Sequence, residues 1–375
     1  MKKITFDEFV SLKRGFDLPE SKIVDGKYPV VASTNIKAYH NAYKVNPPVV
    51  VTGRSGSLGK LQYIDSKCWP LNTSLYSKDF RGNNPKYIYY FLQTMHLEQY
   101  NAGAGVPTLN QNHLQRLKIV VHDIDDQKKV SDILSTYDNL IENNDKRIKL
   151  LEQMAENLYK EWFVRFRFPG YEQIKFIDGI PSDWQILRMS NFCYVTDGTH
   201  DTPKPVNEGG VPLVTGKCIK NGFIDFNETY NISYQDHESI SKRSGLQTGD
   251  ILFSNIGTVG TTCLVNYDRE FSVKNVIIFK PDNIEISNYL YSWLNSDSIQ
   301  AIFATQTNGA SQQFVGLNFM RRFKILVPNE NVLALYSDRI KPIRAEIVKL
   351  HDINENLIKQ RDLLLPRLMS GKLEV

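Results

Sequence analysis

Two long segments of the chain place apolar residues at alternating steps of four and three, which is the spacing of a coiled-coil seam. The first segment covers residues 126–166, and its seam reads Val130, Leu134, Tyr137, Ile141, Asn144, Ile148, Leu151, Ala155, Leu158 and Trp162. The second seam reads Tyr336, Ile340, Ile343, Ile347, Leu350, Asn354, Leu357, Arg361 and Leu364. Each segment is therefore predicted to form one long helix. Pro342 is expected to kink or delay the start of the second helix, and Pro366 to end it.

The two predicted helices occupy equivalent places in the chain, so we expect them to pair with each other in antiparallel orientation. The first would be roughly 60 Å long at 1.5 Å per residue, a length suited to a spacer. Asn144 and Asn354 interrupt the two seams. In this arrangement they are buried polar residues that fix the helix–helix register at some cost in stability.

The sequence before each helix repeats itself. Val211–Val214 matches Tyr28–Val31 at an offset of 183 residues, and the glycine-rich stretch 251–261 matches 50–60. Gly309-Ala310 matches Gly103-Ala104 at an offset of 206. The offset grows because the second copy carries loop insertions. The predicted domains are residues 1–122 and 169–329, each followed by a helical segment, 123–168 and 330–375.

Each copy has the pattern of a mixed α/β domain. Short β-branched runs at 48–52 and 250–253 indicate buried strands bounded by glycine. Segments 85–95 and 286–295 indicate short helices, and each copy ends in a strand, 117–121 and 323–327.

Charge differs between the copies. The whole chain has a formal net charge of +4, but residues 1–120 carry 16 Lys+Arg against 8 Asp+Glu, and residues 171–329 carry 13 against 16. The first copy is therefore suited to a polyanion, while the second must rely on local clusters. The four cysteines form no CxxC pair, and acidic residues precede any apolar run at the N-terminus. We expect reduced thiols, no secretory signal, no membrane span and a cytoplasmic protein.

The order of domain, helix, domain, helix resembles the specificity subunit of type I restriction–modification systems. The C-terminal sequence QRDLLLPRLMSGKL, residues 360–373, is similar to that family's terminal signature. PSDW at 181–184, DGTHDTP at 197–203 and VPLVTGK at 211–217 resemble its usual domain opening. The first copy departs from this pattern, with RGFDLP at 14–19 in place of the DGTH opening.

The resemblance implies two target-recognition domains that each bind one half of a bipartite sequence in double-stranded DNA. It also implies that the helices are a spacer and a docking surface for two methyltransferase subunits. Those partners would bind S-adenosylmethionine and methylate adenine, and a restriction or motor subunit could join them. This chain itself would be non-catalytic, with no cofactor and no metal of its own.

Within each copy, the glycine-rich stretch is the leading candidate for DNA contact. Arg54 can bind guanine with two hydrogen bonds or bind a phosphate, and Asn255 carries an amide suited to adenine. A tight turn with solvated side chains is the structural alternative. The candidate DNA-binding residues are Arg54, Ser55, Ser57, Lys60, Asn110, Gln111, Thr199, His200, Lys217, Lys220, Asn255, Thr258, Gln312 and Gln313.

The sequence leaves two alternative functions open. NPPV at 46–49 is similar to the Asn-Pro-Pro-aromatic motif of amino-methyltransferases, which would make the chain a stand-alone adenine methyltransferase. However, valine holds the aromatic position, and no GxG cofactor loop follows a first strand. A coiled-coil scaffold with two protein-binding heads is the other alternative, and salt-dependent DNA binding would distinguish it from a DNA-reading protein.

Overall fold

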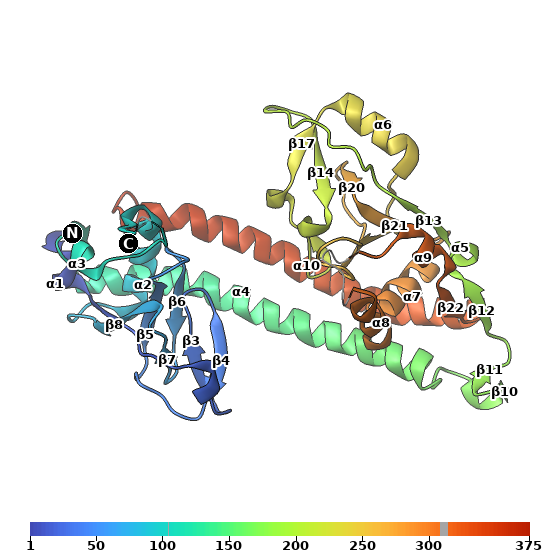
Figure 1. Cartoon of the computed structure of the whole chain (residues 1–375), viewed down its shortest axis with the longest axis horizontal. Coiled ribbons are helices and arrows are strands. Elements are labelled where there is room, and N and C mark those ends of the chain that lie inside the picture. The colour runs from blue at the N-terminus through green and yellow to red at the C-terminus, as the bar shows by residue number, and fades with distance from the viewer. Residues whose placement is uncertain (104, 308–313) are drawn as a thin grey trace. The chain divides into compact units, whose positions relative to one another are not determined.

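The computed structural model describes residues 1–103, 105–307 and 314–375 (Figure 1). It divides into two compact units, Met1–Lys146 with Leu350–Val375 (unit 1) and Arg147–Lys349 (unit 2). Each unit contains one mixed α/β part and portions of two long helices, α4 (Ile124–Tyr159) and α10 (Glu330–Met369). The domain limits drawn from the sequence stay a prediction.

Unit 1 is built on two small sheets and a terminal strand pair. The antiparallel sheet has the order β2 (Ser11–Arg14), β8 (Ser74–Asp79), β5 (Val49–Gly53) and β6 (Leu61–Ile64). In the other sheet, β3 (Tyr28–Val31) lies between β4 (Ile36–His40) and a parallel β7 (Trp69–Pro70). β1 (Lys2–Thr5) pairs with β9 (Lys118–Val121). The helical elements are α1 (Phe6–Phe9), η1 (Glu20–Lys22), α2 (Pro85–Thr94), η2 (Leu97–Tyr100) and α3 (Gln111–Gln115).

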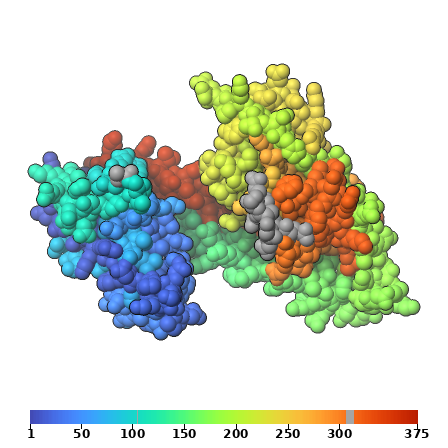
Figure 2. Space-filling model, in the orientation of Figure 1, coloured from blue at the N-terminus to red at the C-terminus, as the bar shows by residue number. Residues whose placement is uncertain are grey.

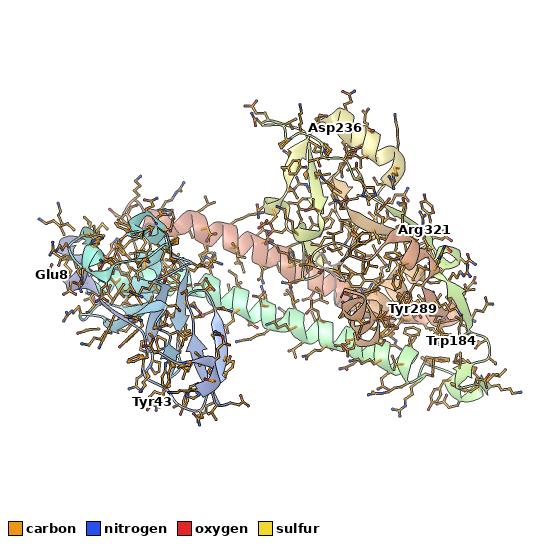
Figure 3. All side chains as sticks on the ribbon, in the orientation of Figure 1. Glu8, Tyr43, Trp184, Asp236, Tyr289 and Arg321 are labelled. Carbon is orange, nitrogen blue, oxygen red and sulfur yellow. The ribbon has the colours of Figure 1, made fainter. Side chains whose placement is uncertain are left out.

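Local sequence explains where these elements begin. β5 reads VVVTG and is buried along its whole length, as expected for a central strand. α2 begins at Pro85 behind the N-cap Asn84, whose side chain accepts a hydrogen bond from the amide of Tyr87. Thr5 forms a capping box at α1 with Glu8, which is labelled in Figure 3.

Unit 2 repeats this plan. Its antiparallel sheet has the order β13 (Tyr194–Asp197), β21 (Val276–Lys280), β18 (Ile251–Ser254) and β19 (Thr262–Leu264). In the second sheet, β14 (Val211–Thr215) lies between β17 (Tyr230–Ile232) and a parallel β20 (Ser272–Lys274), and β12 (Gln185–Arg188) pairs with β22 (Lys324–Val327). The equivalent helices are α5 (Met189–Phe192), α7 (Ile284–Leu294), α8 (Asp297–Thr307) and α9 (Leu317–Arg322). The predicted duplication of a mixed α/β domain is confirmed.

Several elements of unit 2 have no counterpart in the plan of unit 1. Helix α6 (Tyr234–Ser244) and the hairpin β15 (Ile219–Lys220) and β16 (Phe223–Ile224) fall where the sequence offset grows. Short turns η5 (Gly216–Cys218) and η6 (Phe226–Glu228) flank the hairpin, and η4 (Tyr171–Gln173) with the pair β10 (Phe176–Ile177) and β11 (Ile180–Pro181) precedes the repeat. Figure 2 shows the segment around α6, coloured yellow, at the surface of unit 2.

The two long helices pair in antiparallel orientation, as predicted. In unit 1, Arg361 contacts Asp138 at 2.7 Å and Asn144 contacts Asn354 at 2.8 Å. In unit 2, Arg147 contacts Glu346 at 2.8 Å. Partner numbers fall along α10 as they rise along α4, so the helices run in opposite directions. All seam residues named from the sequence are buried or half-buried.

The prediction for Pro366 is wrong, and the other helix ends differ from the sequence prediction in detail. α10 starts at Glu330 and continues through Pro342, so this proline does not delay the start, and a kink at this residue stays a prediction. The helix also passes Pro366 and ends at Met369, where Gly371 takes a left-handed φ of 69°. A proline in the last turn removes one hydrogen bond, and the packing of that turn compensates for it. α4 ends at Tyr159 and continues as a π-helical turn, Lys160–Val164, rather than as α-helix to 166.

Each unit has its own hydrophobic core, and the long helices contribute to both. The unit 1 core joins Phe9, Tyr87 and Leu134 to Leu365 and Leu368 from the end of α10. The unit 2 core includes Tyr289 and Trp184, labelled in Figure 3, together with residues of both long helices. All four cysteines are buried free thiols. No helix among the described residues is both long and apolar enough to cross a membrane.

Candidate nucleic-acid interface

The glycine-rich loop of unit 1 follows β5 and is held in place through its backbone. The amides of Arg54 and Ser55 donate to the carbonyl oxygen of Thr73 at 2.8 and 3.1 Å. The amide of Gly56 donates to the carbonyl oxygen of Pro107 at 2.9 Å, and Gly56 has a φ of 84°, a conformation that favours glycine. The loop backbone is therefore fixed independently of its polar side chains.

Those side chains are available to a partner. Among the described residues, the Arg54 guanidinium makes no hydrogen bond or ion pair, and its residue is half-buried at the loop base. Ser55 is half-buried, while Ser57 and Lys60 are exposed. A guanidinium, two hydroxyls and an ammonium in one short loop suit phosphate oxygens and base edges alike.

The segment before α3 lies against this loop. The amide of Leu109 donates to the carbonyl oxygen of Arg54 at 2.8 Å, which places Asn110 and Gln111 beside it. Asn110 caps α3, and its side chain accepts from the amide of Asn112 at 3.0 Å. The Gln111 Oε1 is buried without a hydrogen-bond partner in the described part of the chain. The structure therefore brings Arg54, Asn110 and Gln111 together.

The corresponding loop of unit 2 uses the same backbone contact but turns its amide inward. The amide of Val315 donates to the carbonyl oxygen of Asn255 at 3.0 Å, as Leu109 does to Arg54. The Asn255 side chain is 6% exposed, and its Nδ2 donates to the carbonyl oxygen of Val315 at 3.3 Å. Thr258, by contrast, is exposed at the loop tip. An adenine contact by Asn255 stays a prediction and would require its side chain to rotate.

His200 belongs to a polar cluster at the end of β13. Its Nε2 lies 3.0 Å from Asp197 Oδ2, and its Nδ1 lies 3.0 Å from Asn275 Oδ1. The Asp197 carboxylate, only 8% exposed, also accepts a hydrogen bond from Arg243 of α6. Thr199 is buried, and its hydroxyl accepts from the amide of Asp201 at 3.1 Å. Both nitrogens of His200 are therefore engaged within the chain.

Lys217 and Lys220 lie in or beside the β15–β16 hairpin, where acidic residues surround them. Lys220 Nζ is 2.9 Å from Asp225 and 3.3 Å from Glu228, and Lys217 Nζ is 4.0 Å from Glu228. The hydrogen bond to Asp225 raises the pKa of Lys220, and Lys220 in turn lowers the pKa of Asp225. A DNA phosphate would have to compete with these carboxylates.

The predicted register residues meet each other. Asn144 Nδ2 donates to Asn354 Oδ1 at 2.8 Å, and Asn354 Nδ2 donates to Asp145 Oδ1 at 2.8 Å. Their effect on register stays a prediction. Gln312 and Gln313 lie outside the described residues. Among the residues that the structure describes, no group of three His, Cys, Asp or Glu side chains could hold a metal ion.

Comparison with known protein families shows which family this chain belongs to. The sequence model described as "Type I restriction modification DNA specificity domain" matches residues 1–153 and 181–359, one match for each copy of the repeat. The chain belongs to this family. It is the specificity subunit of a type I restriction–modification system, as the terminal signature and the duplication predicted.

Individual relatives agree with this assignment. The type I restriction enzyme MjaIX specificity subunit of Methanocaldococcus jannaschii is 24% identical over 82% of this chain and 74% of its own length. The MjaVIII specificity subunit of the same organism is 22% identical over 77% of this chain and 70% of its own length. The crystal structure of a type I S subunit from M. genitalium has the same fold, with a TM-score of 0.63 at 15% identity, covering 98% of this chain and 96% of that chain.

The structure of this specificity subunit also reveals polar residues that the sequence argument missed. Asp197 and Arg243 are 46 residues apart and meet only because α6 packs beside β13. Arg14 and Asp17 lie at the equivalent place in unit 1, with 3.9 Å between Arg14 NH2 and Asp17 Oδ1. The offset of 183 residues pairs Arg14 with Asp197 and could have identified this position.

Proposed function

We propose that each unit of this specificity subunit binds one half of a bipartite sequence in double-stranded DNA. The supporting observation is that the two units repeat the same sheets and the same loop-to-segment hydrogen bond. They carry different side chains at these places, such as Arg54 and Asn255. Two units that share one framework but differ in their loop side chains are suited to recognise two different short DNA sequences.

Two linked half-sites multiply discrimination. Each mismatched base pair costs about 1–3 kcal/mol, so neither unit alone needs to distinguish its site from the whole genome. Once one unit is bound, linkage raises the effective concentration of the other near its own half-site. The continuous helices α4 and α10, of 36 and 40 residues, are suited to act as the linking element.

The test of bipartite recognition is a map of methylated adenines in cells that carry the chain with its methyltransferase partners. We expect a motif of two defined blocks separated by unspecified bases. Scrambling either block alone should then weaken the binding of the purified assembly to the duplex. A single continuous motif, or indifference to one block, would contradict the proposal.

We further propose that the outer faces of the long helices dock two methyltransferase subunits, which bind S-adenosylmethionine and methylate adenine. On α4, Ile133 and Leu140 are 38% and 47% exposed in unit 1, and Leu150 and Met154 are 60% and 54% exposed in unit 2. Exposed leucine and methionine on a helix already paired through its seam suit further helix packing. A restriction or motor subunit could join the same assembly.

A charge placed on this outer face tests the docking. Leu140→Asp should prevent co-purification of a methyltransferase subunit, because a carboxylate would be buried without a partner. Asn139→Asp is the matched control, since Asn139 is exposed on the same helix but lies about 100° around the helix axis from Leu140. If both variants retain two methyltransferase subunits, docking on this face is excluded, whatever the DNA-binding result.

A further inference from the structure

The equivalent strands β2 of unit 1 and β13 of unit 2 end in residues of opposite charge. Arg14 ends β2 in unit 1, and Asp197 ends β13 in unit 2. The backbones match at this point, because the next residue in each case, Gly15 or Gly198, donates its amide at 3.0 Å to the carbonyl oxygen of the first residue of the partner strand, β8 or β21. The two positions are therefore structurally equivalent despite their opposite charges.

Both units nevertheless carry an arginine beside a carboxylate here. In unit 1 the arginine is Arg14 itself, and the carboxylate is Asp17, three residues later. In unit 2 the carboxylate occupies the strand end, and Arg243 reaches it from α6. Unit 1 has no helix in residues 41–48, all of which are described, so no helix between β4 and β5 could supply an arginine. Each unit thus has an arginine beside a carboxylate at this strand end, and the arginine comes from a different element in each unit.

The two guanidiniums are also equally accessible. The side chains of Arg14 and Arg243 are each 53% exposed. Each contacts its carboxylate through one terminal nitrogen, and the structure gives the remaining N–H groups no partner among the described residues. An arginine has five donors in a fixed planar arrangement, so each can bind a second anion without leaving its carboxylate.

Neighbouring side chains fix the carboxylate side of each pair. Asn72 donates to Asp17 in unit 1. In unit 2, His200 lies between Asp197 and Asn275, with both ring nitrogens engaged at 3.0 Å. His200 therefore acts on Arg243 only through Asp197, as a positioning residue. Figure 3 labels Asp236 on α6, the helix that carries Arg243.

We infer that Arg14 and Arg243 are equivalent contacts to DNA phosphates, one in each unit. This rests on the proposed function, and it names a contact that the two units share. Phosphates are common to every sequence, whereas bases differ between half-sites. An arginine present at this strand end in both units, whose loops differ, is suited to the phosphates of the DNA backbone, while the loop residue Arg54 is suited to bases.

The experiment compares Arg14→Gln and Arg243→Gln in the assembly of the full chain with its methyltransferase subunits. Binding is measured by titration between 50 and 200 mM salt, on a duplex with the methylated motif and on one without it. Each variant should lose affinity by about tenfold on both duplexes, and the slope of log K against log salt should fall by about 0.9. The methylated motif should be unchanged.

The matched controls are Arg81→Gln in unit 1 and Arg165→Gln in unit 2, because both arginines are exposed and paired with carboxylates elsewhere. They should leave affinity and slope unchanged. Arg243→Lys tests whether a loss of binding comes from misfolding around Asp197. It keeps the positive charge, so the slope of log K against log salt should be unchanged. Unchanged binding in the glutamine variants, or a motif relaxed at one base pair, overturns the inference. An unmutated assembly that lacks salt-dependent DNA binding would instead overturn the proposed function.

Discussion

Single buried polar side chains decide several properties of this subunit. Asn144 and Asn354 are 9% and 6% exposed, and each depends on a partner for its amide hydrogen bonds. A buried amide without a partner costs roughly 1–3 kcal/mol, whereas removing both partners of a pair can be neutral or stabilising. Single and double substitutions should therefore act in opposite directions.

We expect Asn144→Leu/Asn354→Leu to raise the thermal midpoint, because two buried amides become apolar contacts in the seam. Asn354→Leu alone should lower stability by about 1–3 kcal/mol, since Asn144 then loses its acceptor. Calorimetry of the single and double variants measures both effects. A double variant that unfolds at lower temperature than the unmodified chain would show that the pair does not impose the predicted cost.

His122 should make unit 1 sensitive to mild acid. The residue is 5% exposed, and its Nδ1 lies 3.0 Å from the Tyr87 hydroxyl. Burial lowers the pKa of His122, with Asp126 opposing the shift. The unfolded chain therefore binds a proton more readily, so stability present above the usual histidine pKa near 6.5 is lost as pH falls through that value.

The measurement is the thermal unfolding midpoint of the unmodified chain and of His122→Gln at several pH values from 7.5 to 5.5. The variant should lose less stability on acidification, because glutamine does not titrate and can keep a hydrogen bond to Tyr87. His113→Gln, at an exposed position of α3, should follow the unmodified chain. If the thermal midpoint fell equally steeply with pH in all three proteins, His122 would be ruled out as the acid-sensitive group.

For single residues, the sequence was sufficient to identify polar candidates but not the residues with which they form hydrogen bonds. The polar character of His200 and Asn255 was recognised, but the inward hydrogen bond of Asn255 depends on Val315, 60 residues away. Arg243 was missed for the same reason, since nothing local marks an arginine on α6 as the partner of Asp197. Long-range contacts of this kind leave no periodic signal along the chain.

At the scale of elements, the end of α10 belongs to the core of unit 1. Leu368 is 1% exposed and packs with residues of α2 and α4, more than 200 residues earlier in the sequence. This packing explains why the helix continues through Pro366, which local rules identified as its end. The seam spacing was sufficient to predict both helices and their pairing, because periodicity reports the buried face directly. It carried no information about the terminal turn.

Leu368→Ala should therefore destabilise unit 1 by about 2–5 kcal/mol, the usual cost of truncating a buried leucine. Urea unfolding of the full chain, followed by fluorescence, reports the change. Leu363→Ala is the matched control on the same helix, because Leu363 is 67% exposed, and its effect should stay within about 0.5 kcal/mol. Similar losses in the two variants would mean that the last turn does not contribute to the core.

At the scale of the whole molecule, duplication allows the two units to be changed independently. Arg54 and Asn255 occupy equivalent loops, and the hydrogen bonds that fix each loop lie within its own unit. Arg54→Ala should relax one base pair in one block of the methylated motif, and Asn255→Ala one base pair in the other block. A lost bidentate base contact corresponds to about 1–3 kcal/mol of discrimination.

Sequencing of methylated adenines in cells that carry each variant measures this directly. The unaffected block of each motif serves as an internal control for folding and assembly, since a misfolded subunit would lose methylation at every site. Asn255→Ala also removes an amide that donates to Val315 at 3.3 Å, so its thermal midpoint must be compared with that of Arg54→Ala. If either substitution altered both blocks at once, the two units could not be reading their half-sites separately, and the functional meaning given to the duplication would be lost.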